Sequence, residues 1–214
     1  MSILNQLQQN KGAVSSKLGK ELAEKVLKGD KVILKEAVRL CTFNDKNVRA
    51  GAAKIIEKVA EKKPELVSPY LKDLFSALES PEAQTRWMII YAFGYCAKLN
   101  PDISVKALPK AKKFLEEESG ACLWDRTIIY LGYLGAVSSK NAKHVVPLLE
   151  FALEKIPGQT KTILESFERI LPVADTGMKN KILKYAKKYS NDKKASVKAK
   201  AIKLEKRVNG HYPK

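Results

Sequence analysis

Apolar residues recur along the chain at helical spacing, three and four positions apart. The segment 46–62 has five of them on one side, Val48, Ala52, Ile55, Ile56 and Val59. Such a stripe predicts an amphipathic helix with one face in a core. No run of residues alternates apolar and polar positions between hairpin turns, so we expect no strands.

The segment 47–60 recurs four more times in altered form, with a basic residue at the same position of each copy. These basic residues are Arg49, Arg86, Arg126, Lys161 and Lys198, at successive spacings of 37, 40, 35 and 37 residues. A period of about 20 to 50 residues is typical of a repeat array. The sequence therefore predicts a continuous array of helix pairs whose core runs along its length.

Breaks between the apolar stripes give the expected organisation. We expect N-terminal capping helices at 1–29, a repeat array at 30–209 and a tail at 210–214. The predicted repeats are 30–63, 64–100, 101–138, 139–174 and 175–209.

Turn residues set the expected helix ends. The first repeat should hold helices 31–42 and 46–62, capped by Asp30 and Asp45. Helices in the other repeats are expected at 65–79, 81–99, 144–155, 158–173, 178–189 and 193–208. Ser80-Pro81 fits an N-cap followed by proline at the first helical position. Lys11-Gly12 should separate the two capping helices.

The repeat resembles the HEAT repeat, in which a proline lies inside the first helix and Val-Arg with small residues lies in the second. Val48-Arg49 with Ala52-Ala53 is the best copy, and Pro69, Pro109 and Pro147 fall in first helices. The resemblance implies an all-α fold: a right-handed α-α superhelix, or solenoid, of about five helix pairs. Second helices of that family line a concave side, and most members are scaffolds. Repeat four departs by its Lys161, and repeat five lacks the proline.

The second helices of the middle repeats carry aromatic residues opposite the expected core stripe. With the phase of the first repeat, the inward residues of the second are Thr85, Ile89, Ala92, Phe93 and Cys96. The opposite side then holds Trp87, Met88, Tyr91 and Tyr95, and in the third repeat Trp124, Thr127, Ile128 and Leu131. Either this side binds a partner, or curvature buries it in the core.

The partner-binding candidates combine the aromatic side chains with neighbouring arginines: Arg86, Trp87, Tyr91, Tyr95, Trp124 and Arg126. Tyr, Trp and Arg are enriched at interface hot spots, and aromatic rings beside Arg also suit stacking with nucleobases. For the repeated basic residues, the alternative is that they hydrogen-bond to turns of their own or the next repeat, as in HEAT-like repeats.

The net charge of +17 favours an anionic partner or simply a soluble, lysine-rich surface. Positions 175–214 hold 13 lysines and arginines against three acidic residues, a net charge of +10. Lys193, Lys200, Lys203 and Arg207 fall on one side of the last predicted helix and form a candidate anion-binding strip. Binding there would be non-specific and salt-dependent. The alternative is a charged cap that prevents end-to-end stacking.

Little in the sequence indicates catalysis. His144 and His211 lack metal-ligand neighbours, and the three cysteines lie in apolar helical runs, where a free cysteine acts as a small hydrophobe. We expect no metal and no cofactor. Positions 1–19 lack a secretory signal, and the longest uncharged apolar run has 11 residues, too short to cross a membrane. We expect a cytoplasmic protein.

Trp124-Asp125 is similar to part of the Trp-Asp-x-x-Asp stretch of bacterial alkylpurine DNA glycosylases, which are built from HEAT-like repeats. The second Asp of that stretch falls on Ile128 here, which leaves Asp125 as the catalytic candidate. The expected function is that of a non-enzymatic scaffold whose concave aromatic and basic surface holds a protein partner. The alternatives are a nucleic-acid-binding module and a glycosylase relative, and the oligomeric state stays open.

Overall fold

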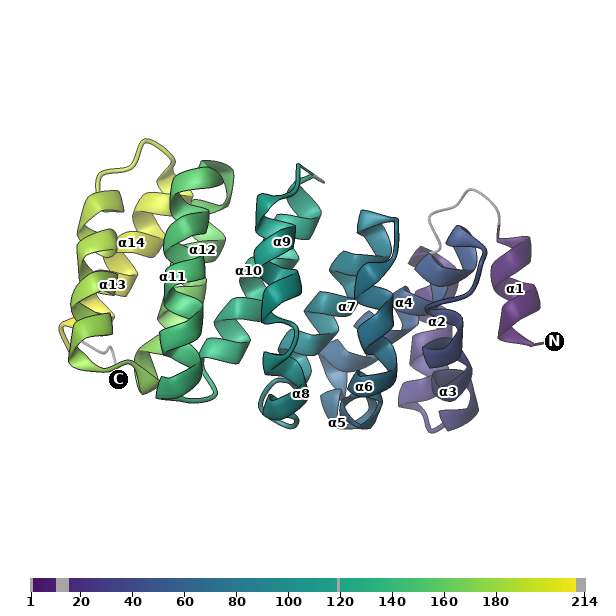
Figure 1. Cartoon of the computed structure of the whole chain (residues 1–214). Helices are drawn as coiled ribbons and strands as arrows, with labels where there is room; N and C mark the ends of the chain where they lie inside the picture. The colour runs from purple at the N-terminus through teal and green to yellow at the C-terminus, as the bar shows by residue number, and fades with distance from the viewer. Residues whose placement is uncertain (1, 11–15, 119, 211–214) are drawn as a thin grey trace. The chain divides into compact units, whose positions relative to one another are not determined.

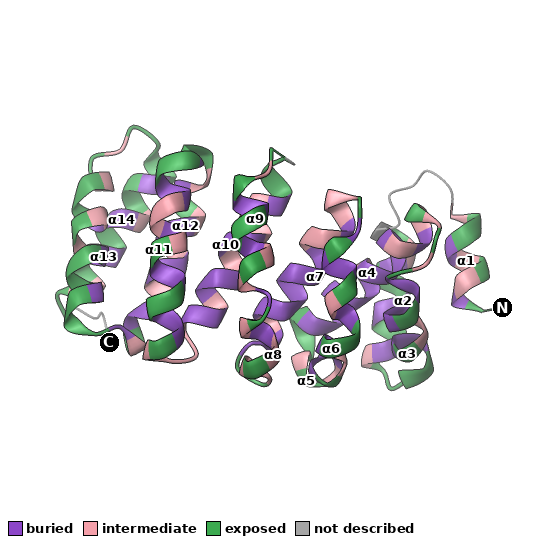
Figure 2. Ribbon diagram, in the orientation of Figure 1, coloured by how far each residue is buried: buried purple, intermediate pink, exposed green. Residues whose placement is uncertain are grey.

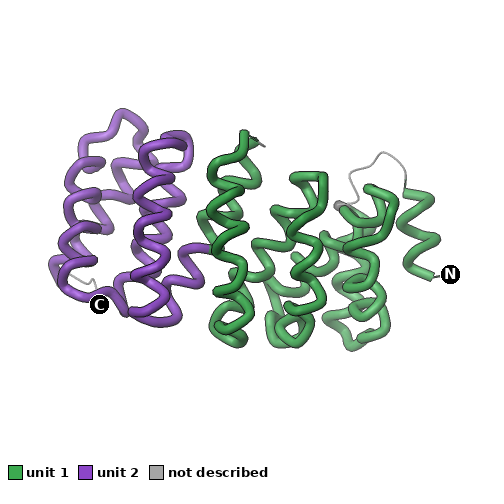
Figure 3. The backbone as a smooth tube through the Cα atoms, in the orientation of Figure 1, with its two compact units in different colours: residues 1–130 green, residues 131–214 purple. Residues whose placement is uncertain are grey.

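The computed structural model is helical, without strands, over the residues that it describes, 2–10, 16–118 and 120–210 (Figure 1). The chain divides into two compact units, Met1–Tyr130 and Leu131–Lys214, and the division falls within one helix, α10 (Figure 3). The predicted break at Lys11-Gly12 and the tail beyond position 210 lie outside the described residues.

Unit 1 begins with four helices: α1 (Ile3–Gln9), α2 (Ser16–Leu27), α3 (Lys31–Leu40) and α4 (Lys46–Lys62). They are followed by α5 (Pro64–Val67), η1 (Ser68–Tyr70), α6 (Leu71–Leu74), η2 (Phe75–Glu79) and α7 (Ala83–Cys96). The unit continues with α8 (Pro101–Val105), α9 (Leu108–Glu116) and the larger part of α10 (Ala121–Gly135).

Helix α4 is the second helix of the first repeat, and its local sequence determines where it begins and which side it buries. Asp45 Oδ1 accepts hydrogen bonds from the backbone N–H groups of Asn47 and Val48, at 2.7 and 3.3 Å. The predicted cap is confirmed, and such a cap stabilises by about 1 kcal/mol. All five residues of the predicted apolar stripe have no exposed surface. Helices α2, α3 and α7 pack around α4, which places its stripe in the core of unit 1 (Figure 2).

Prolines divide the first helices of the second and third repeats. A proline ring inside a helix removes an N–H donor and clashes with the preceding turn. The predicted helix 65–79 is helical over its whole length, but it consists of four short α and 3-10 pieces, and Pro69 lies in η1. Pro109 follows the break between α8 and α9. Pro147, by contrast, lies inside α11, which continues past it.

Unit 2 contains the end of α10 and two helix pairs: α11 (Ser139–Lys155), η3 (Pro157–Gln159), α12 (Thr160–Ile170), η4 (Leu171–Val173), α13 (Thr176–Tyr189) and α14 (Ala195–Val208). Helix α14 packs against both α12 and α13. Gly132 in the last turns of α10 lies so near α12 that a Cβ there would be 2.7 Å from Ser166 Oγ. The absence of a side chain at Gly132 permits this close packing.

Buried polar and thiol groups complete the core of unit 1. The Tyr130 hydroxyl donates to the Ser104 carbonyl oxygen at 2.7 Å, and burial raises the pKa of Tyr130. Cys41 and Cys96 are buried, as predicted, and burial raises the pKa of the Cys96 thiol to about 12. Cys122 is exposed on the first turn of α10, so the prediction that it packs as a small hydrophobe is wrong.

Candidate functional site

The second helix α7 carries three aromatic residues one turn apart: Trp87, Tyr91 and Tyr95. Residues four positions apart on a helix lie side by side. The rings of Tyr91 and Tyr95 accordingly lie 4.6 Å apart between centroids, and the Tyr95 hydroxyl donates to the Tyr91 hydroxyl at 2.7 Å. Trp87 and Tyr95 are half-buried, whereas Tyr91 is only 8% exposed.

Arg126 comes from the next second helix, α10, and completes a tyrosine–arginine cluster made of Tyr91, Tyr95 and Arg126. Its guanidinium carbon lies 4.2 Å from the centre of the Tyr91 ring, a cation–π geometry. Asp125 Oδ2 lies 3.7 Å from Arg126 Nη1, and both side chains are about one-third exposed. Of the two alternatives left open for the aromatic side of α7, Tyr91 follows the buried one. Arg126 and Tyr95 are the more accessible members.

Two other candidates, Arg86 and Trp124, are held by one turn of unit 1. Arg86 Nη1 lies 2.7 Å from Glu117 Oε2, and its guanidinium lies 5.3 Å from the centre of the Phe114 ring. Trp124 Nε1 donates to the Glu117 backbone oxygen at 2.8 Å. These contacts join α7 and α10 to the end of α9 through Arg86 and Trp124, whose part in partner binding stays a prediction.

The repeated basic residues do not share one role. Arg49 donates to the turn oxygens of Phe43 and Asn44 at 2.6 and 2.9 Å and pairs with Glu82, the N-cap residue of α7. The Ser80 hydroxyl also donates to Glu82. Helix α7 begins at Ala83 with Glu82 as its N-cap residue, so the predicted cap at Ser80 and start at Pro81 are wrong. Arg49 and Arg86 thus each bond to the following repeat, as the HEAT-like alternative predicted.

The remaining basic residues depart from that pattern. Arg126 lies on Tyr91 of the preceding second helix. Lys161 lies 3.9 Å from Glu165 of its own helix, and Lys198 is exposed. The predicted equivalent position holds for Lys198, which is the fourth residue of α14 as Arg49 and Arg86 are of α4 and α7. Arg126 and Lys161 are the sixth and second residues of α10 and α12, so the prediction is wrong for these two.

Part of the predicted open side is core. The buried residues are Met88, at 1% exposure, and Thr127, Ile128 and Leu131, each at 0%. α7 is apolar on nearly every side, which is typical of a buried helix, and Figure 2 shows both α7 and α10 mostly in the buried colour.

The error in the third repeat is one of register. Gly94-Tyr95 and Gly132-Tyr133 lie 38 residues apart, whereas Arg86 and Arg126 lie 40 apart. With a spacing of 38, buried residues align with buried ones except at Met88 and Tyr91, and half-buried Tyr95 aligns with half-buried Tyr133. Arg169 of α12 lies 5.0 Å from the Tyr133 ring, a second arginine–tyrosine contact that the Gly-Tyr repeat could have indicated.

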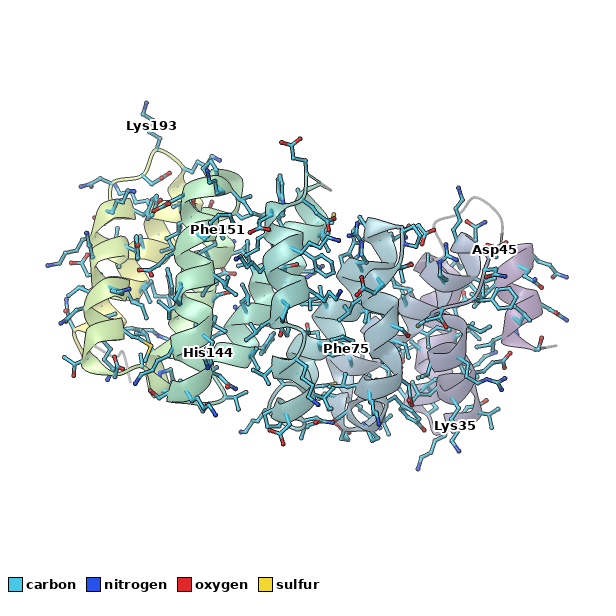
Figure 4. The ribbon with its side chains drawn as sticks, in the orientation of Figure 1. Lys35, Asp45, Phe75, His144, Phe151 and Lys193 are labelled. Carbon is cyan, nitrogen blue, oxygen red and sulfur yellow. The ribbon has the colours of Figure 1, made fainter. Side chains whose placement is uncertain are left out.

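The predicted anion-binding strip on α14 is partly neutralised within unit 2. Lys200 Nζ and Arg207 Nη1 lie 3.1 and 2.6 Å from Glu168 carboxylate oxygens of α12, and Lys203 Nζ lies 3.8 Å away. Lys193 precedes the first residue of α14 and lies outside the strip (Figure 4). The sequence pattern on α14 gave no sign of the carboxylate on α12.

The described residues show little that fits a small-molecule or metal site. A surface hollow in unit 1 is lined by charged side chains alone, Lys20, Glu24, Lys58, Glu61 and Lys62, whereas ligand pockets are mostly apolar. In the part of the chain that the structure describes, no group of three His, Cys, Asp or Glu side chains could hold a metal ion. His144 is exposed (Figure 4), and His211 lies outside the described part. None of the described helices is long and apolar enough to cross a bilayer.

Neither a protein-family model nor a curated protein matches the chain. Its structure is similar to an engineered protein solved by the Northeast Structural Genomics Consortium, with a TM-score of 0.67 and 16% identity over 98% of this chain and 100% of that one. A designed armadillo repeat protein in complex with the peptide (KR)4 is similar at a TM-score of 0.66 and 14% identity, over 96% and 90%. Armadillo repeat proteins designed computationally for modular peptide recognition give 0.64 and 14%, over 94% and 93%. The fold is an armadillo-like helical repeat.

These similarities confirm the predicted all-α repeat architecture. At 12–16% identity they concern the fold alone. None of these neighbours is described as a glycosylase, so the role of Asp125 in base excision stays a prediction.

Proposed function

We propose that the chain is a repeat-type binding protein that holds an extended segment of a protein partner on unit 1, with Trp87, Tyr95 and Arg126 as the contact side chains. The seating of Arg126 over Tyr91, beside the Tyr91–Tyr95 pair, carries the proposal. Arg, Tyr and Trp are the side chains that dominate interface hot spots. A half-exposed group of all three on neighbouring second helices suits the centre of an interface.

The cluster is ordered before any partner binds. The hydroxyl–hydroxyl bond fixes Tyr95 against Tyr91, and the cation–π contact with Asp125 alongside fixes Arg126. Immobilising a flexible side chain costs about 0.5–1.5 kcal/mol on association. Since these side chains are already held, a partner avoids part of that cost.

The designed structural neighbours support a peptide as the partner, but the charge of that peptide should differ. One such neighbour binds the basic peptide (KR)4. The present chain carries a net charge of +17 and would repel a basic segment. We therefore expect a segment with aromatic or aliphatic side chains beside acidic ones, so that a carboxylate can approach Arg126.

A peptide-library selection tests the proposal. Peptides are selected on the wild-type protein, and their affinities are then measured for Trp87→Ala and Tyr95→Ala by fluorescence anisotropy. Each variant should weaken binding about 30-fold, the effect of a hot-spot loss of about 2 kcal/mol. Tyr70→Ala, which removes a half-buried tyrosine on η1, is the matched control and should bind as wild type. Equal affinities for all four proteins would contradict the proposal.

The same assay addresses single-stranded nucleic acid as the alternative ligand of these rings. Bases stack on aromatic side chains beside basic groups, and phosphate contacts make such binding weaken steeply with salt. A labelled single strand that binds more tightly than any selected peptide, and that is lost in Trp87→Ala, would favour this alternative.

A further inference from the structure

Two groups of lysines in unit 2 differ in their partners. On α14, Lys200 and Lys203 face the carboxylate of Glu168, which also receives Arg207. On α13, Lys181 is paired with Glu150 at 3.2 Å. The positive charge of the strip on α14 is therefore partly cancelled inside the unit, and the excess lies elsewhere.

The second group consists of five exposed lysines, Lys184, Lys187, Lys188, Lys193 and Lys194, which we call the lysine face. The first three lie on the outer side of α13, whose inner residues Met178, Ile182 and Ala186 are buried. Within the described residues none of the five side chains has an acidic partner in any ion pair found. Figure 4 shows Lys193 extending away from the turn that links α13 and α14.

The turn beside the lysine face supplies one carboxylate, that of Asp192, against five lysines. Asp192, the acidic residue of the turn, accepts the backbone N–H of Lys194 at 2.7 Å. Lys188 lies 5.3 Å from the centre of the Tyr189 ring, which carries no charge. On a helix Lys184 and Lys188 are about 6 Å apart along the axis, and the turn begins directly after α13. The five lysines thus follow one another along the outer side of α13 and into the turn after it.

We propose that the lysine face binds the phosphate backbone of double-stranded nucleic acid without reading its sequence. Lysine is a flexible point charge that attracts phosphate, and each phosphate neutralised releases counterions from the duplex. The face contains no arginine, whose rigid planar fork makes bidentate contacts that the point charge of lysine does not pre-organise. Its chemistry therefore favours backbone contact over base contact.

Two other anionic surfaces fit the face less well. Helices that lie on a membrane insert large apolar side chains, yet the apolar side of α13 is buried, and the exposed large apolar residue found in unit 2, Ile202, is on α14. Protein interfaces are enriched in Arg, Tyr and Trp and depleted in Lys, and the lysine face consists of lysines alone. A polyphosphate backbone remains the best match.

The test compares two triple variants of the whole chain that lose the same charge. One is Lys184→Gln/Lys187→Gln/Lys188→Gln. The other, the control, is Lys72→Gln/Lys106→Gln/Lys112→Gln, which removes three exposed lysines of unit 1. Binding of a labelled duplex of arbitrary sequence is followed by anisotropy across a salt series. Circular dichroism checks that both variants fold.

If all five lysines contact phosphate, wild-type affinity should fall about 500-fold between about 50 and 200 mM salt. The α13 variant, with two contacts left, should fall only about tenfold over the same range and bind more weakly at low salt. The control should follow the wild type, and so should Trp87→Ala, which separates this proposal from the peptide site of unit 1.

Three results would overturn the proposal. Equal losses in both triple variants would show attraction by net charge alone. Retention of the wild-type salt slope in the α13 variant would place the contacts elsewhere. Binding to phosphatidylserine-containing vesicles or to polyglutamate, without binding to the duplex, would assign the face to a membrane or to an acidic protein.

Discussion

Substitution of Gly132 by alanine tests how closely α10 and α12 pack in unit 2. The added Cβ would lie 2.7 Å from Ser166 Oγ, 2.8 Å from its Cβ and 3.0 Å from its Cα. Rotation of the Ser166 side chain can relieve only the first contact. The Cβ and the backbone atom can yield only if the two helices separate.

Two effects of opposite sign determine how much Gly132→Ala changes the free energy of unfolding. Alanine is favoured over glycine in a helix interior by about 1 kcal/mol. Overpacking of a well-packed core costs about 1–3 kcal/mol, and the backbone contact puts this site toward the upper end. We expect a net loss of about 1–2 kcal/mol, which lowers the melting temperature of a chain of this size by about 2–8 °C.

Gly177 of α13 provides the matched control. A Cβ there would meet only Asp175 Oδ1, at an ordinary 3.5 Å, so Gly177→Ala should stabilise by up to about 1 kcal/mol. Urea denaturation followed by far-ultraviolet circular dichroism compares both variants with the wild type. A Gly132→Ala protein as stable as Gly177→Ala would refute the close packing of α10 and α12.

Two further predictions concern titratable groups of unit 1. The hydrogen bond from Arg49 lowers the pKa of Glu82 below its ordinary 4.5. The ionised Glu82 side chain therefore stabilises the folded protein fully above its pKa in the unfolded chain, and this contribution is lost as pH falls through its lower pKa in the folded protein. The free energy of unfolding, measured from neutral pH down to pH about 3, should drop less for Glu82→Gln than for the wild type. Parallel curves for the two proteins would contradict this. Burial keeps Cys41 and Cys96 protonated, so a thiol reagent at neutral pH should modify only Cys122 in the native protein. Rapid modification of all three cysteines would contradict their burial.

Features set by neighbours in sequence were predicted correctly. The cap at Asp45 and the apolar stripe of α4 need only residues within one or two turns, and both are confirmed. The division of the first helix at Pro69 was missed although the cause is also local, because the HEAT pattern tolerates a proline inside a continuous helix, as α11 does at Pro147.

The roles and burial of the residues that the sequence did not predict depend on contacts between helices. Arg126 was assigned to the position of Arg86, yet its partner is a ring on the preceding second helix, and nothing within α10 indicates that contact. Glu168 pairs with three cations of α14 from thirty or more positions away. The aromatic residues of α7 were expected either exposed or buried, and the structure divides them: Tyr91 is buried, while Trp87 and Tyr95 are half-buried.

The fluorescence of Trp87 is the most direct test of the proposed peptide site. A Trp124→Phe protein has Trp87 as its single tryptophan, since the chain contains two. Titration with a selected peptide should shift the Trp87 emission to shorter wavelength, saturably and with the affinity found by anisotropy, because the half-buried ring becomes covered. Saturated peptide binding with unchanged Trp87 emission would contradict the account and place the partner on another surface.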